Sequence, residues 1–181
     1  MHLPEQPPVQ TGHPGSRATT YVEPGNRVAD AVLAGAKTVE HWYFLTEVDA
    51  AEAPGADAIA VLGDSITDGA TASLDQDQRW TDHLAARLAP EGVAVVNAGI
   101  SGGRLLRDGM GESARKRFQR DVLDQPGVAS VIVLIGINDI SWPGTAFART
   151  QARPSLAELQ AGYRDLAQRA HARGLRILGA T

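Results

Sequence analysis

The chain is 181 residues long, with 43% hydrophobic residues, 21% charged residues and a formal net charge of -4. This length suits one domain of ordinary size with a real hydrophobic core. The negative charge argues against a nucleic-acid partner, and the absence of cysteine excludes disulfide scaffolds, thiol catalysis and cysteine-ligated zinc. The longest uncharged apolar run, residues 128–137, is far shorter than the about 20 residues of a membrane-spanning helix, so no membrane partner is expected.

Residues 1–57 are predicted to form an N-terminal extension that is partly irregular. Prolines and glycines recur through residues 4–25 and interrupt any helical or strand period. Residues 19–22 suit a short extended segment. Residues 38–48 are rich in aromatic and β-branched side chains, which predicts one strand near 38–48. An Ala/Pro/Gly connector covers residues 50–57.

From residue 58 to residue 181, apolar strands alternate with amphipathic helices. Strands are predicted at residues 58–62, 93–96, 128–135 and 175–178. Helices are predicted at residues 79–89, along the spacing Ala114, Phe118 and Val122, and after the capping box of Ser155 and Glu158. This alternation predicts an α/β fold, a three-layer α/β/α sandwich around a parallel sheet. The last strand is followed by only a few residues, so we expect the domain to be incomplete at its C-terminus.

Three of the predicted strands end in unusual polar and glycine-rich motifs. Residues 63–69 read Gly-Asp-Ser-Ile-Thr-Asp-Gly, residues 97–103 read Asn-Ala-Gly-Ile-Ser-Gly-Gly, and residues 136–139 read Gly-Ile-Asn-Asp. The carboxyl ends of parallel strands meet at one edge of the sheet. We therefore expect the three motifs to converge on one crevice.

The residue types in these motifs suit acyl transfer. A serine hydroxyl such as that of Ser65 becomes a nucleophile when a neighbouring base takes its proton. Acyl transfer also needs hydrogen-bond donors aimed at the developing oxyanion. The backbone N–H groups of Ser65 and Gly102 and the side-chain amide of Asn138 would supply three such donors. We interpret the neighbouring Asp64 and Asp139 as hydrogen-bond acceptors that organise the turns.

The three motifs, in this order and each at a strand end, resemble the first three sequence blocks of the SGNH hydrolases, also called GDSL esterases or lipases. The resemblance covers residues 58–181 and implies a flavodoxin-like sheet with no metal or cofactor. It also implies that Ser65 is the nucleophile and that Ser65, Gly102 and Asn138 form the oxyanion hole. The residues from Trp42 to Leu45 resemble a subgroup that is often linked to the breakdown of plant polysaccharides.

One block of this family is missing from the sequence. In the family, the base and the residue that orients it come from a late Asp-x-x-His block, and no Asp in this chain has His three residues later. Of the five histidines, His83 lies beside the apolar stripe of its helix and is expected to be half-buried, and His171 lies near a helix end. We therefore expect a fragment of a longer hydrolase, nearly inactive by itself on activated esters.

Four other questions of interpretation remain open. Residues 99–103 also match G-x-S-x-G, which would make Ser101 a nucleophile, but that motif needs a helix directly after the serine and residues 104–111 are predicted to be a loop. A doubly wound sheet with glycines at its strand ends suits a phosphate-binding module as well. Trp42 and Tyr43 would suit a non-catalytic carbohydrate-binding module. Trp142 either forms a wall of the substrate pocket or packs its own loop.

We thus expect a serine esterase that acts on carboxylic esters through an acyl-enzyme. Acetyl esters on carbohydrate are the preferred substrate class, with short-chain lipid esters as the alternative. The expected partner is a small-molecule or carbohydrate ester. The sequence predicts neither the compartment nor the oligomeric state.

Overall fold

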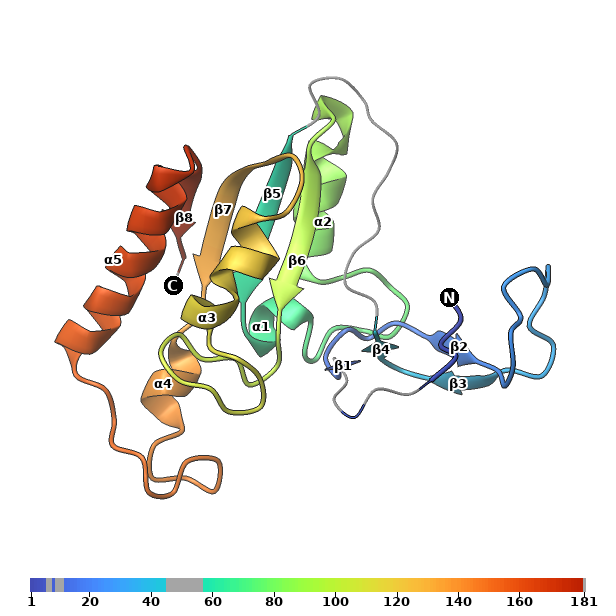
Figure 1. Ribbon diagram of the computed structural model, residues 1–181, viewed down its shortest axis with the longest axis horizontal. Coiled ribbons are helices and arrows are strands. Elements are labelled where there is room, and N and C mark those ends of the chain that lie inside the picture. Colours follow the sequence, from blue (N-terminus) through green and yellow to red (C-terminus); the bar gives the residue numbers. More distant parts are fainter. Residues whose placement is uncertain (6–7, 9–11, 45–56, 181) are drawn as a thin grey trace.

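The computed structural model describes residues 1–5, 8, 12–44 and 57–180. Its centre is a four-stranded sheet whose neighbouring strands all run parallel (Figure 1). The strands are β5 (Ala58–Gly63), β6 (Ala94–Gly99), β7 (Val128–Leu134) and β8 (Arg176–Gly179), in the spatial order β6-β5-β7-β8. Of these four strands, β5 comes first in the sequence, and it lies between β6 and β7. The strand order therefore reverses at β5, as in a flavodoxin-like sheet.

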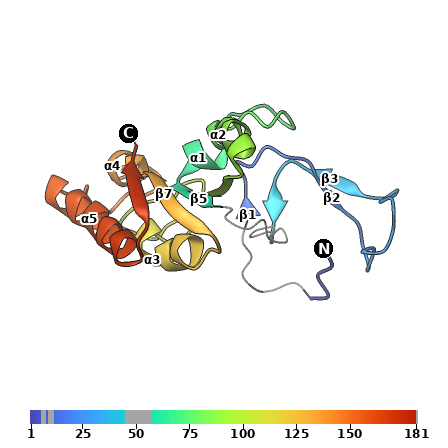
Figure 2. The same ribbon diagram turned by 90° about the horizontal axis from the view of Figure 1, so that it is seen from above.

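Helices cover both faces of this sheet, which gives the three layers predicted from the sequence (Figure 2). One face carries α1 (Ser65–Asp68) and α2 (Trp80–Leu88). The other carries α3 (Ala114–Phe118), the π-helical turn η2 (Gln119–Leu123) and the long α5 (Leu156–Ala172). The main hydrophobic core lies between this second layer and the sheet, and its fully buried members include Leu62, Leu105, Phe118, Val122, Val131 and Leu166.

The parallel register brings the strand ends level with one another. Gly63, the last residue of β5, pairs with Gly99 of β6 on one side and with Leu134 of β7 on the other. The loops after these three strands therefore leave the sheet at the same edge. Gly99 lets α1 pack directly on this edge, because a Cβ atom at Gly99 would lie 2.3 Å from the backbone nitrogen of Asp68.

Most elements of the α/β part agree with the predicted ones, and the short ones do not. The predicted helix at 79–89 is α2 followed by the 3-10 turn η1 (Ala89–Glu91), and the Ser155 capping box begins α5 as expected. The sequence did not predict α1 or α4 (Ile137–Ser141). Helices of four or five residues have no room for a repeating apolar period, so they form only on tertiary support.

The N-terminal segment forms two small antiparallel sheets. β1 (Gly12–His13) pairs with β4 (Trp42–Tyr43), and β2 (Thr20–Val22) pairs with β3 (Lys37–Val39). The prediction of one strand near 38–48 is wrong for its described part, because the chain changes partner strand between β3 and β4. Residues 45–48 and the predicted connector at 50–56 lie outside the described residues.

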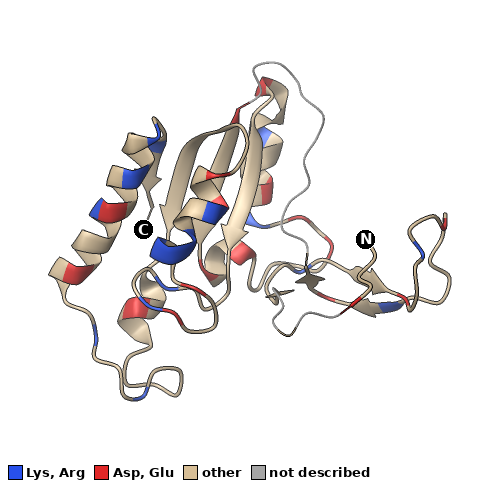
Figure 3. Cartoon of the chain, viewed as in Figure 1, with Lys and Arg blue, Asp and Glu red and all other residues tan. Residues whose placement is uncertain are grey.

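Charged residues of both signs are interspersed over the helices, as Figure 3 shows for α5. Three consecutive basic residues, Arg115, Lys116 and Arg117, lie on α3. Within the described ranges, no helix combines the length and the apolar character needed to cross a membrane.

Candidate active site

Ser65 is the first residue of α1, directly after the central strand. The Asp64 carboxylate caps this helix, because its Oδ1 accepts a hydrogen bond from the Ile66 N–H at 3.0 Å. Ser65 itself is partly exposed while Asp64 and Thr67 around it are buried. As the first helical residue, Ser65 has a backbone N–H without an intrahelical acceptor. The described residues also offer no hydrogen-bond partner to its hydroxyl, so the hydroxyl and the N–H are both available at the sheet edge.

Gly102 lies in the loop that follows β6. Its φ of 76° falls in the left-handed region that favours glycine. The next N–H, that of Gly103, donates to the Ile100 carbonyl at 2.8 Å and tightens the turn. Within the described part of the chain, the N–H of Gly102 has no acceptor. It is therefore free to bind an oxygen atom of a ligand.

Asn138 is buried on α4, after β7. Its Nδ2 donates to the Gly103 carbonyl oxygen at 2.9 Å, which joins the third motif to the second. This bond uses one of the two amide hydrogens and leaves the other for a ligand. Asp139 strengthens the same junction, because its carboxylate accepts the N–H groups of Leu105 at 2.6 Å and Leu106 at 3.0 Å. The structure thus brings Ser65, Gly102 and Asn138 to one edge, and Asp64 and Asp139 accept backbone hydrogen bonds as interpreted from the sequence.

A buried arginine that the sequence analysis did not single out holds two of these strand ends together. Arg117 of α3 donates to the carbonyl oxygens of Gly63 at 2.8 Å and Ala98 at 2.6 Å, and to the Asp121 carboxylate at 2.9 Å. Only 1% of Arg117 is exposed. Arg117 lies three residues after Ala114 on the apolar face of α3, and this position was the sequence signal that could have predicted its burial.

The electrostatics of this edge follow from its burial. Loss of hydration raises the pKa of the Asp64 carboxyl, while its hydrogen bond from Ile66 and the charge of Arg117 act in the opposite direction. Burial likewise lowers the pKa of the Arg117 guanidinium, and its bond to Asp121 opposes that shift. Asp64 is therefore a poorly hydrated carboxylate directly beside Ser65.

Ser101, the alternative nucleophile, is already engaged by a carboxylate. Its Oγ donates to Asp68 Oδ2 at 2.6 Å, and its N–H donates to the same oxygen at 3.2 Å. Turns and bends follow it through residue 113, so the helix that a nucleophile elbow requires is missing there. These contacts favour a structural role for Ser101.

The two histidines that the sequence placed on helices, His83 and His171, are both exposed. His83 is exposed on α2, so the expectation that it would be half-buried is wrong. His171 is exposed in the last turn of α5, toward the opposite edge of the sheet. In the described residues, no histidine hydrogen-bonds Ser65, and no group of three His, Asp or Glu side chains could hold a metal ion.

Apolar side chains flank Gly102. A Cβ atom at Gly102 would lie 2.7 Å from Met110 Sδ and 2.8 Å from Trp142 Cη2, so both side chains lie against the glycine. Phe147 stacks on Trp142 with a centroid distance of 4.8 Å, and 67% of Phe147 is exposed. Trp142 is therefore both a neighbour of Gly102 and a packing partner in its own loop.

A cavity of about 560 Å³ lies in the N-terminal segment. Trp42, Tyr43 and Tyr21 contribute to its lining, together with Glu23 and Arg27. Trp42 also packs under the Arg79 guanidinium, 5.1 Å from its ring centroid.

A flavodoxin-like sheet with Ser65, Gly102 and Asn138 at adjoining strand ends defines the fold class of the SGNH hydrolases. The chain belongs to the GDSL-like lipase/acylhydrolase family, whose model matches residues 61–181.

Solved structures agree with this fold. AlinE4, an SGNH-hydrolase family esterase, is 22% identical, and the match covers 71% of this chain and 60% of AlinE4 with a TM-score of 0.54. TesA is 31% identical over 68% of this chain and 59% of its own, with a TM-score of 0.51. The psychrotrophic esterase EstA from Pseudoalteromonas sp. is 22% identical over 68% of this chain and 58% of its own, with a TM-score of 0.50. The chain thus spans 58–60% of the length of these proteins. A comparison with curated protein sequences found no match.

Proposed function

We propose that this chain carries the nucleophile and oxyanion hole of a serine esterase, with Ser65 attacking a carboxylic ester. The observation that supports this most directly is that, among the described residues, the N–H groups of Ser65 and Gly102 have no acceptor, while the Asn138 amide bonds the carbonyl of the adjacent Gly103. Such donors bind the oxygen on which negative charge develops as the tetrahedral intermediate forms. The alcohol then leaves, and water releases the acid from the acyl-enzyme.

The proposal also includes the source of the base. Ser65 needs a group that accepts its proton, and the described histidines make no hydrogen bond to it. We propose that an Asp-x-x-His block outside these 181 residues supplies the base and its orienting carboxylate. The chain by itself would then retain only the contribution of its oxyanion donors, about 10³–10⁴-fold over water in a well-studied serine protease.

For the substrate, we propose acetyl esters on carbohydrate. Met110 and Trp142 lie against Gly102 and narrow the space there, which favours a small acyl group. The exposed ring of Phe147, stacked on Trp142, offers an apolar face of the kind on which a sugar ring packs. Short-chain lipid esters are the alternative, because Ile66, Ile137 and Ile140 also expose apolar surface near this edge.

The test is covalent labelling with a fluorophosphonate, followed by peptide mass spectrometry. It is run on the 181-residue chain and on a longer chain that also carries an Asp-x-x-His block. We expect a slow adduct on Ser65 in the first and a fast one in the second. Ser65→Ala should abolish labelling. Ser101→Ala should cost much less and leave the adduct on Ser65, because it removes one of the two hydrogen bonds to Asp68 but not the nucleophile. An adduct on Ser101 in the unmodified protein would overturn the assignment.

Asn138→Ala measures the oxyanion donor in the same assay. Removal of one such donor slows the reaction by about 10²–10³-fold, and the labelling rate should fall by this factor. Initial rates on aryl acetate, aryl butyrate and an acetylated sugar then separate the two substrate classes. Preference for the butyrate would favour the lipid ester.

The N-terminal cavity supports a second candidate function, a carbohydrate-binding surface. Aromatic rings beside the charged side chains of Glu23 and Arg27 suit the apolar and polar faces of a sugar. Titration of tryptophan fluorescence with xylan fragments tests this, with Tyr21→Ala as the variant because Tyr21 lines the cavity and is exposed. Equal responses of the two proteins would argue against this function.

A further inference from the structure

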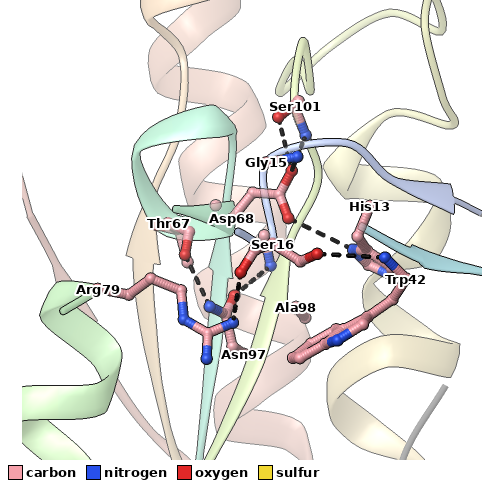
Figure 4. Close-up of polar contacts among 12 residues, drawn as sticks. His13, Gly15, Ser16, Trp42, Thr67, Asp68, Arg79, Asn97, Ala98 and Ser101 are labelled. Atoms are coloured by element: carbon pink, nitrogen blue, oxygen red, sulfur yellow. Dashed lines mark hydrogen bonds and ion pairs between the residues drawn. The ribbon is translucent and has the colours of Figure 1, made fainter. Parts of the chain in front are cut away.

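Asp68, the last residue of α1, joins the N-terminal segment to the loop that carries Gly102. The carboxylate is only 3% exposed. Its Oδ2 accepts the N–H of Ser101 at 3.2 Å and the Ser101 hydroxyl at 2.6 Å. The same oxygen accepts the N–H of Gly15 at 3.2 Å, and His13 Nδ1 lies 3.5 Å from Oδ1 (Figure 4).

Residues 13–17, here called the strap, fit closely into this junction. A Cβ atom at Gly15 would lie 2.7 Å from Asp68 Oδ2 and 2.9 Å from Ser101 Oγ. Because the φ of Gly15 is not in the left-handed region, it is the close approach of these two side-chain atoms that favours a glycine there. The strap backbone therefore lies directly against both groups.

Further contacts hold the strap in place. The Ser16 Oγ accepts the N–H of Trp42 at 3.2 Å, and the Ser16 carbonyl accepts a hydrogen bond from Arg79 Nη1 at 3.4 Å. The Arg79 guanidinium also covers the Trp42 ring. The strap is thus fixed to α2 on one side and to Asp68 on the other (Figure 4).

The loop after Ser101 needs such an anchor. Gly102 and Gly103 follow in direct succession, and glycine backbones adopt many orientations at little cost. The peptide that joins Ser101 to Gly102 contains the N–H proposed for the oxyanion hole. Two hydrogen bonds from Ser101 to one buried carboxylate restrict that peptide at its N-terminal side.

We infer that Asp68 is a positioning residue for the oxyanion hole and that the strap is part of the active-site structure. The strap holds Asp68, Asp68 holds Ser101, and Ser101 orients the N–H of Gly102 toward the reacting carbonyl. This inference rests on the proposed esterase function. It assigns residues 13–17, which lie about fifty positions before Ser65 in the sequence, to the support of the same site.

The experiment compares Gly15→Ala with Gly12→Ala in the 181-residue chain. A Cβ atom at Gly12 would meet its nearest neighbour at 3.7 Å, an ordinary contact, so this variant is the matched control. Amide hydrogen exchange at Ser101 and the ¹⁵N–¹H resonance of Gly102 report the loop directly. The rate of Ser65 phosphonylation, with its saturation constant, reports the chemistry.

In Gly15→Ala we expect exchange at Ser101 to accelerate about tenfold, the effect of weakening one charge-assisted hydrogen bond. The Gly102 resonance should move, and the maximal labelling rate should fall by about 10²-fold, as for a misplacement of about 1 Å. The saturation constant should change little, because the strap does not touch the substrate. Gly12→Ala should match the unmodified chain in every readout.

Asp68→Asn is the second variant and guards against misfolding of Gly15→Ala. The amide retains an acceptor oxygen but loses the charge, so it should show the same changes with a smaller amplitude. Unchanged Gly102 resonance and labelling rate in folded Asp68→Asn would overturn the inference. If Ser65 reacts neither in the 181-residue chain nor in the longer chain with an Asp-x-x-His block, the proposed function fails, and the two amide readouts still decide whether the strap positions the loop.

Discussion

Asp64 caps α1 at the position directly before Ser65, and it does so as a buried carboxylate. Capping requires an acceptor oxygen but not a charge, so an asparagine meets the same geometric need. Burial makes the ionised form costly, which is why the pKa of Asp64 is raised from its ordinary value of 3.8. The charge of Arg117 only partly offsets this cost.

Asp64→Asn is expected to reduce the loss of stability that accompanies rising pH. With a raised pKa, the folded state binds more protons than the unfolded chain between pH 3.8 and the raised value. Stability of the unmodified chain therefore falls with rising pH through this window, and the variant lacks that contribution.

Urea unfolding from pH 3 to pH 7 measures this difference. The free energy of unfolding of the variant, minus that of the unmodified chain, should increase as pH rises. The increase should be at most about 1.4 kcal/mol per pH unit. A difference that shrinks with rising pH would mean that the pairing with Arg117 outweighs burial.

At the scale of elements, α3 keeps the ends of β5 and β6 together. Arg117 donates to the Gly63 and Ala98 carbonyls, which lie at the start of the motifs that contain Ser65 and Gly102. A charged side chain is tolerated in this interior because three acceptors surround it, one of them the Asp121 carboxylate. Removal of the guanidinium takes one charged donor from each of them, although Asp121 keeps its bond from Arg120 and the Gly63 carbonyl keeps the N–H of Ile100.

Arg117→Met is expected to lower the free energy of unfolding by about 3 kcal/mol, the usual effect of breaking a buried, charged hydrogen-bond cluster. Arg115→Met is the control on the same helix, because Arg115 is exposed and its ion pair with Asp165 lies at the surface. The control should stay within about 0.5 kcal/mol. Denaturant unfolding of both variants decides the point, and equal losses would contradict the role given to Arg117.

For the whole molecule, the edge of the sheet at β8 is the feature that bears on association with other chains. Within the described residues, β8 pairs only with β7, so its other side has unpaired backbone groups. Leu178 on this strand is 54% exposed. Leu156, the first residue of the adjoining α5, is 71% exposed. An unpaired strand with apolar side chains is a template for association with other chains.

We therefore expect the 181-residue chain to self-associate as its concentration rises. Leu178→Lys should shift the distribution toward monomer, because a charge on an edge strand opposes edge-to-edge pairing. Val32→Lys is the control, since Val32 is exposed on the N-terminal segment and distant from β8 in sequence. Sedimentation velocity over a range of concentrations measures the effect, and equal shifts in the two variants would place the association elsewhere.

The sequence alone determined the fold class and the positions of the three motifs. Strand and helix periods are local properties, so the alternation from residue 58 onward predicted the parallel sheet. The roles proposed for Ser65, Gly102 and Asn138 likewise come from short motifs. Only the tertiary structure decided which distant groups support them. Arg117 reaches back to Gly63, Asp68 joins Gly15 to Ser101, and residues 37–43 divide between two partner strands. These contacts join residues far apart in the chain, and a local pattern contains no information about which distant backbone groups it will meet on folding.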